Sequence, residues 1–138
     1  MTPPYLLLVD DDPDDCDLFS EAFHSRNPDI AVKYAGGGRE VLDFLERCEK
    51  DQLPAVLLID YQMPGINGRE LLRILQANSR YRHLVKVMWS TSIRVKDMED
   101  CKRDGALQYL IKPATNEDLD QVIHQMTTIF VQSARGFN

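Results

Sequence analysis

The residues best suited to chemistry are carboxylates that directly follow apolar runs of the chain. Asp10 and Asp11 follow the run Tyr5–Val9, and Asp60 follows the run Val56–Ile59. Continuous apolar runs of this length are typical of strands buried on both faces of a parallel sheet. In open α/β sheets, ligands bind just outside the carboxyl ends of the strands. We therefore expect the three carboxylates to gather at one edge of a sheet.

A set of carboxylates without cysteine or histidine offers hard oxygen ligands only. Such ligands select Mg²⁺, which prefers octahedral oxygen coordination and usually retains waters and a substrate phosphate. Asp10 and Asp11 would repel each other at a strand end unless a cation joined them, so we expect a metal there. Capping of a turn or a helix is the simpler alternative for Asp60 and for this pair.

Two further strand ends carry groups that suit a phosphoryl ligand. Ser90 follows the expected strand 84–89, and Lys112 follows the expected strand 107–111. A lysine ammonium is a compact point charge for a phosphoryl oxygen, and a serine hydroxyl can donate a hydrogen bond to another. Together with the carboxylates, they predict a site that holds a phosphoryl group on an aspartate.

Segments with helical periodicity alternate with the strands and would position these groups. Pro13, with Asp12 as the cap before it, suits the start of the first helix. Gly105 is suited to end the fourth, the mostly polar segment 95–103. The order is β-α repeated five times. The sequence therefore predicts an α/β fold, a doubly wound (βα)5 structure with a five-stranded parallel sheet and helices on both faces.

The later aspartates of the N-terminal cluster have a local explanation. Asp14, Asp15 and Asp17 lie in or near the first turn of the expected helix, where the helix dipole favours negative charge. We therefore assign them no part in the site.

Composition narrows the classes of partner. The 138 residues carry 22 acidic and 16 basic side chains, a net charge of −6, which disfavours direct binding of nucleic acid. The three cysteines form no CxxC pair and indicate reduced thiols. No apolar run approaches the roughly 20 residues of a membrane span, and no signal-peptide pattern precedes the first strand. We expect residues 1–138 to form a single cytoplasmic domain without an output domain, acting by binding other proteins.

Over nearly its whole length the chain resembles the receiver domains of two-component response regulators. The resemblance rests on Val9-Asp10-Asp11, on the loop Asp60-x-x-Met63-Pro64-x-x-x-Gly68, on Ser90, and on Lys112-Pro113. It implies a flavodoxin-like receiver fold and phosphorylation of Asp60 from the phosphohistidine of a sensor histidine kinase, with Mg²⁺. Phosphorylation would switch a surface that binds a downstream protein.

For the metal, the resemblance implies that Asp11, Asp60 and the main-chain carbonyl of Gln62 hold Mg²⁺, and that Asp10 reaches it through water. Gln62 also bears on the main alternative, a Mg²⁺-dependent phosphatase with an aspartyl nucleophile. Such an enzyme needs a second Asp two residues beyond the nucleophile as general acid, and a carboxamide cannot serve. A flavodoxin-like binding module, the third class, would not need charged groups at the strand ends.

For the phosphoryl group, the resemblance implies contact with Lys112 and a switch pair formed by Ser90 and Tyr109. It also implies a cis peptide bond between Lys112 and Pro113. Ser90 stands where threonine is usual, so the hydroxyl is kept but is less rigid about χ1.

Two segments are similar to stand-alone regulators of the phytochrome-associated type. They are Asp10-Asp11-Asp12-Pro13-Asp14-Asp15 and Trp89-Ser90-Thr91-Ser92. This similarity implies a phytochrome-type histidine kinase as the partner.

The last helix carries more apolar surface than one core stripe needs. Ile129 and Val131 flank Phe130, and Phe137 lies near the end of the chain. A symmetric homodimer through this end and a longer core helix both remain open as explanations.

Overall fold

Five strands alternate with five α-helices in the computed structural model, which describes residues 2–135. The strands are β1 (Tyr5–Val9), β2 (Ala31–Ala35), β3 (Val56–Asp60), β4 (Val85–Ser90) and β5 (Gln108–Ile111). The helices are α1 (Pro13–Arg26), α2 (Gly38–Arg47), α3 (Gly68–Ala77), α4 (Val95–Arg103) and α5 (Asn116–Ala134), with a 3-10 turn, η1 (Lys50–Gln52), after α2. The β-α order predicted from the sequence is confirmed.

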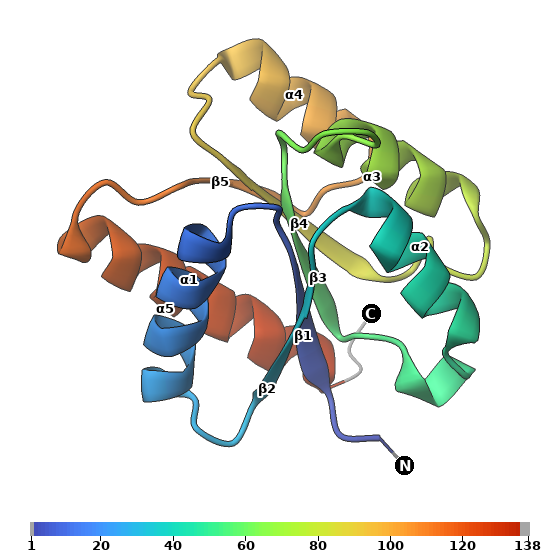
Figure 1. Ribbon diagram of the computed structural model, residues 1–138, viewed down its shortest axis with the longest axis horizontal. Coiled ribbons are helices and arrows are strands. Elements are labelled where there is room, and N and C mark those ends of the chain that lie inside the picture. Colours follow the sequence, from blue (N-terminus) through green and yellow to red (C-terminus); the bar gives the residue numbers. More distant parts are fainter. Residues whose placement is uncertain (1, 136–138) are drawn as a thin grey trace.

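All five strands are parallel and lie in the order β2-β1-β3-β4-β5, which is the flavodoxin-like receiver arrangement (Figure 1). Every residue of β1 and β3 is buried, which explains why these runs are continuously apolar rather than alternating. Successive side chains enter two different cores, because a strand points them to opposite faces of the sheet. Leu7 and Leu57 belong to one core, and Leu8 and Leu58 belong to the other.

Helices cover both faces of the sheet, with α1 and α5 on one side and α2, α3 and α4 on the other (Figure 1). Aromatic contacts hold α1 and α5 on their side of the sheet. The ring centre of Phe23 lies 6.4 Å from that of Phe130, and the ring centre of Phe19 lies 5.7 Å from that of Trp89. Burying each such ring contributes on the order of 1.5–3 kcal/mol. The two cores therefore hold the carboxyl ends of the strands rigidly at one edge of the molecule.

The mostly polar helix α4 is attached to α3 largely through charges. Arg69 of α3 contacts Asp100 at 3.3 Å and Asp104 at 2.9 Å, and Arg73 contacts Asp104 at 3.0 Å. Burial opposes the charge of Asp104, but its hydrogen bonds to the two arginines lower its pKa below the ordinary value. Only Cys101 supplies a fully buried apolar anchor from this helix.

Several expectations need correction or refinement. The peptide bond between Lys112 and Pro113 is trans, so the expected cis bond is wrong. The trans form is the more stable one before proline, by about 0.5–1 kcal/mol.

Ile129 lies in the core between α1 and α5 and is not spare apolar surface. Val131 is partly exposed, and Phe137 lies outside the described residues. Less exposed apolar surface therefore supports the homodimer than the sequence indicates, and the homodimer stays a prediction.

Among residues 2–135, no helix is both long enough and apolar enough to cross a membrane.

Candidate functional site

The carboxyl ends of the strands bring the predicted site residues to one edge of the sheet. Asp60 is the last residue of β3 and is paired in register with Trp89 of β4. Ser90 is the last residue of β4 and is paired with Ile111, directly before Lys112. The predicted convergence of strand ends is therefore confirmed.

Asp10, Asp11 and Asp60 form a cluster in which one carboxylate oxygen from each lies within 4.8 Å of the others. Asp10 and Asp60 are buried, whereas Asp11 is exposed and closes the cluster on the solvent side. Oxygen ligands of this kind, without sulfur or imidazole, suit a hard divalent cation. The three carboxylates predicted from the sequence are thus brought together as a candidate metal site.

One oxygen of Asp10 supports this assignment. Its Oδ1 accepts a hydrogen bond from the Asp12 amide at 2.9 Å, but its Oδ2 is buried and has no hydrogen-bond partner among the described residues. The Lys112 ammonium lies 3.0 Å from that Oδ2 without hydrogen-bond geometry. A buried polar atom left unsatisfied costs about 1–3 kcal/mol. A bound cation, or water on that cation, would satisfy it, so the site fits a divalent metal.

Lys112 is the cation of the site, and its side chain is 11% exposed. Its Nζ donates a hydrogen bond to Asp15 Oδ2 at 2.7 Å, and it lies 3.0 Å from Asp10 Oδ2 and 3.4 Å from Asp60 Oδ2. The Nζ also sits 5.0 Å from the centre of the Trp89 ring, within the range of a cation–π interaction. One ammonium therefore faces three carboxylates.

The environment shifts the pKa of both partners at the centre of the site. Burial, and next the charge of Asp10, raise the pKa of Asp60 to about 7, although the Gln62 amide and Lys112 act in the other direction. Burial opposes the charge of Lys112. Its contacts with Asp15 and Asp10 and the charge of Asp60 nevertheless raise its pKa above the ordinary value. Lys112 is therefore an ammonium, and a cation beside Asp60 would keep that carboxylate ionised.

The loop after β3 folds back tightly over the strand end. The Gln62 amide donates to Asp60 Oδ1 at 3.1 Å, and the Gly68 amide donates to the Tyr61 carbonyl at 3.1 Å. A Cβ on Gly68 would overlap the carbonyl oxygen of Asp60, so the motif requires glycine there. Asn67 then caps α3 through a reciprocal pair of hydrogen bonds with Glu70. The loop thus fixes the orientation of the Asp60 side chain.

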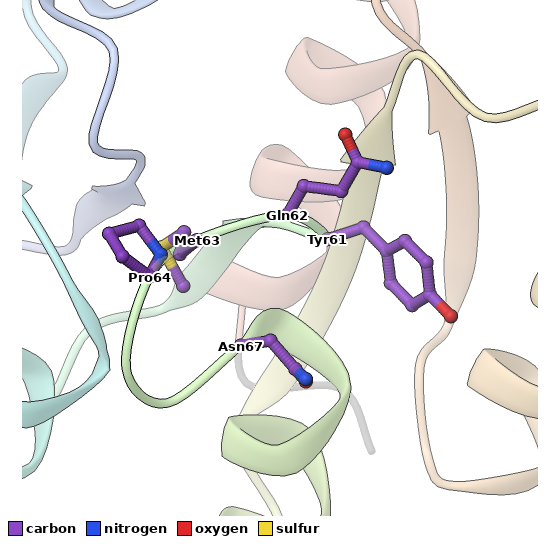
Figure 2. Close-up of a pocket in the computed structure, with 5 residues that line it drawn as sticks. All are labelled: Tyr61, Gln62, Met63, Pro64 and Asn67. Carbon is purple, nitrogen blue, oxygen red and sulfur yellow. The ribbon is translucent and has the colours of Figure 1, made fainter.

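An open pocket of about 480 Å³ lies along this loop and is lined by Tyr61, Gln62, Met63, Pro64 and Asn67 (Figure 2). Figure 2 shows the side chains of Gln62 and Tyr61 directed away from the part of the loop that carries Pro64, with Asn67 at the start of α3. The pocket gives an approaching group access to the loop that follows Asp60.

The proposed switch pair lies beside the site and is linked through Ser92. Ser90 is buried and its Oγ accepts a hydrogen bond from the Ser92 amide at 3.0 Å. Tyr109 is also buried, and its hydroxyl donates to the Ser92 carbonyl at 3.0 Å. A switch of this kind predicts that Tyr109 turns inward on phosphorylation, and in this structure its side chain already lies inward. Its rotation stays a prediction, because one conformation does not test it.

Four residues near the site were not singled out from the sequence. Asp97, buried in the first turn of α4, accepts hydrogen bonds from Ser92 Oγ at 2.6 Å and from the Tyr61 hydroxyl at 3.3 Å. The bond from Ser92 is the main reason that the pKa of Asp97 is lowered. The first three are Asp97, Ser92 and Tyr61, and the fourth is Asp15, which accepts a hydrogen bond from Lys112. The position of Asp15 in the first turn of a helix that begins right after a strand end indicates that its side chain lies near the site, but it does not indicate the contact with Lys112.

The family model of the response regulator receiver domain matches residues 6–124. The chain therefore belongs to the receiver-domain family of response regulators, which are signalling domains.

Similar proteins agree with this assignment. The nitrate/nitrite response regulator protein NarL of Escherichia coli K12 is 32% identical over 124 residues, which cover 89% of this chain and 54% of NarL. An uncharacterized 14.6 kDa protein of Leptolyngbya boryana is 30% identical, and 94% of each chain is covered. The chain thus spans about half of NarL but nearly all of the second relative.

Solved structures share the fold. The phosphorylated cyanobacterial phytochrome response regulator RcpA superposes with a TM-score of 0.84 at 22% identity, covering 96% of both chains. The Mn²⁺-bound form of response regulator Rcp1 gives a TM-score of 0.76 at 23% identity, covering 91% of this chain and 93% of that one. At these identities the likeness establishes the fold alone.

Proposed function

We propose that this receiver domain is a phosphoacceptor. Asp60 takes a phosphoryl group from the phosphohistidine of a sensor histidine kinase, with Mg²⁺ in the site. The observation behind the proposal is the position of Asp60 at the end of the central strand, clustered with the carboxylates of Asp10 and Asp11 and 3.4 Å from the ammonium of Lys112. A structural aspartate would not need this combination of buried charges.

The metal would be held by Asp11, Asp60 and the main-chain carbonyl of Gln62, and by Asp10 through water. When bound, it supplies neutralisation of charge on the phosphoryl oxygens. Asp60 is the nucleophile: its oxygen forms the new bond to phosphorus as the bond to the kinase histidine breaks, and the imidazole leaves.

Lys112 and Ser90 complete the environment of the transferred group. Lys112 already lies 3.4 Å from Asp60 Oδ2 and can donate to a phosphoryl oxygen. Ser90, buried at the end of the neighbouring strand, can donate to another while it still accepts from the Ser92 amide. Catalysis of this kind consists of positioning and electrostatic stabilisation rather than proton transfer.

The output would be a change in a protein-binding surface near α4 and β5. The chain of contacts from Ser90 through Ser92 to Tyr109 supports this proposal, because a shift of Ser90 reaches Tyr109 through two hydrogen bonds. The net negative charge supports a protein rather than nucleic acid as the direct partner.

We further propose a phytochrome-type histidine kinase as the partner and the cytoplasm as the place of action. The first is supported by the shared fold with RcpA, described as a cyanobacterial phytochrome response regulator. Action as a single-domain regulator without an output domain stays a prediction.

A time course with acetyl phosphate and Mg²⁺ tests the proposal against its alternatives. A regulator should gain a phosphoryl group that intact-mass measurement detects, and should lose the adduct slowly after acetyl phosphate is removed. A phosphatase should release free phosphate rapidly without accumulating the adduct, although Gln62 cannot act as the required general acid. A binding module should do neither. Addition of EDTA should abolish labelling, and labelling that survives chelation would contradict the metal assignment.

A further inference from the structure

Lys112 makes its shortest contact with a carboxylate outside the proposed metal site. Its Nζ donates a hydrogen bond to Asp15 Oδ2 at 2.7 Å, whereas Asp60 Oδ2 lies at 3.4 Å. Within residues 2–135, Lys112 is the only ion-pair partner of Asp15. The ammonium that would bind the phosphoryl group therefore lies closer to Asp15 than to Asp60.

The position of Asp15 is fixed by the first helix. Asp15 is the third residue of α1, which is capped by Asp12 and anchored in the core by the buried Phe19. Its side chain is 32% exposed, while that of Lys112 is 11% exposed, so Asp15 holds the ammonium from the solvent side of the site. The first-turn position explains the negative charge of Asp15 through the helix dipole, but it does not explain the contact with Lys112.

Phosphorylation of Asp60 would set two anions in competition for this one ammonium. A phosphoryl group brings roughly 1.5–2 negative charges and three acceptor oxygens. A lysine has three donors but a single centre of charge, so Asp15 and the phosphoryl oxygens would share the charge of one ammonium. Asp15 also repels the incoming group as a like charge. Both effects oppose the phosphorylated state.

We propose that Asp15 is a positioning residue that draws Lys112 away from Asp60 and thereby lowers the affinity of the site for a phosphoryl group. This inference rests on the proposed function. Apart from this like-charge repulsion, Asp15 acts through Lys112, and it does not contact the reacting atoms. The hydrogen bond from Lys112, which follows β5, to Asp15 of α1 would thus oppose phosphorylation of Asp60.

The test is the affinity for beryllium fluoride, a mimic of the phosphoryl group, at saturating Mg²⁺. Asp15→Asn should bind it more tightly than wild type by about three- to tenfold, since an ion-pair hydrogen bond that is partly screened by solvent is removed. Asp14→Asn is the matched control. It removes the same charge from the same helical turn, and no ion pair of Asp14 is present in the described part of the chain.

A spectroscopic measurement separates positioning from a general structural effect. Without beryllium fluoride, the NMR signals of the Lys112 ε-methylene group should shift in Asp15→Asn and stay unchanged in Asp14→Asn. Equal beryllium fluoride affinities for the two variants, or an unchanged Lys112 signal in Asp15→Asn, would overturn the inference alone. If the wild type binds no beryllium fluoride and takes no phosphate from acetyl phosphate, the proposed function fails and this inference falls with it.

Discussion

Trp89 is placed where it can report on the charge of the site. It is the only tryptophan of the chain, it is 1% exposed, and its ring lies 5.0 Å from the Lys112 ammonium. In the sheet it is paired in register with Asp60. A change in charge at the carboxylate cluster therefore acts on the indole at short range.

We expect Mg²⁺ titration to change the fluorescence of Trp89, and we expect Asp11→Ala to abolish the change because a proposed direct ligand is lost. Asp14→Ala, which removes a nearby carboxylate outside the cluster, should leave the titration intact. A wild-type titration curve in Asp11→Ala would place the metal elsewhere.

Lys86 is a second buried lysine and has no role in the proposed chemistry. Its ammonium is enclosed near the start of β4, where it donates to Gln76 Oε1 at 3.0 Å and to the Arg82 carbonyl at 2.9 Å. Burial, and next the charge of Arg82, lower its pKa from 10.5 to about 8. Between these two values the unfolded chain binds a proton that the folded chain has released, so the free energy of unfolding must rise with pH.

We expect wild type to gain roughly 3 kcal/mol relative to Lys86→Met as pH rises through this window, since one pKa unit corresponds to about 1.4 kcal/mol. Urea unfolding of both proteins at several pH values measures the difference and cancels the titration of other groups. Equal pH dependence in the two proteins would show that the Lys86 pKa is not lowered.

The residues that could be predicted from the sequence share a physical feature. Asp10, Asp60 and Lys112 each lie at or directly after the end of a strand that the sequence predicts, so the strand locates them before any contact is known. Asp15 lies 97 residues from Lys112 along the chain, and its sequence neighbourhood already offers a sufficient local reason for a negative charge. A long-range pair of this kind leaves no periodic signal, which is why it was missed.

Among the helices, α4 is the one that we expect to move most easily. It depends on ion pairs to α3 and on Asp97, which ties its first turn to Ser92 and Tyr61. Exposed Ile93 and Val95 lie at the same end of the helix, 72% and 65% exposed. The bounds of α4 could be predicted from the sequence, whereas its mode of attachment could not, because ion pairs between helices depend on how the elements are arranged in space.

Ser90→Ala tests how the site communicates with this region. Asp60 should still accept phosphate from acetyl phosphate, but the phosphorylation-induced NMR shifts at Tyr109 and α4 should be small, because the hydrogen bond from Ser90 to the phosphoryl group is lost. One charge-assisted hydrogen bond is worth about 1.5–3 kcal/mol, enough to shift populations about tenfold or more. Thr91→Ala, at the exposed neighbouring residue, is the control. Full wild-type shifts in Ser90→Ala would mean that the relay does not use this hydroxyl.

At the scale of the whole molecule, two regions differ. The sheet and its two cores form a packed body, and the loops at the carboxyl ends of the strands carry the candidate site. Two cores on opposite faces enclose β1, β3 and β4, so we expect a change at Asp60 to be transmitted first through the loops at the carboxyl edge of the sheet. The fold class was predictable because buried parallel strands are apolar throughout. The inward orientation of Tyr109 and the role of Ile129 in the core were not, since both depend on packing between distant segments.

The most direct measurement compares wild type and Asp60→Asn after incubation with acetyl phosphate and Mg²⁺, by intact mass followed by peptide mapping. Asparagine keeps the size of the side chain but removes the nucleophilic carboxylate. We expect wild type to gain a single phosphoryl group on the peptide that contains Asp60, and Asp60→Asn to gain none. Labelling of Asp60→Asn at the wild-type level, or a phosphoryl group mapped to another residue of the wild type, would contradict the assignment of Asp60 as the phosphoacceptor.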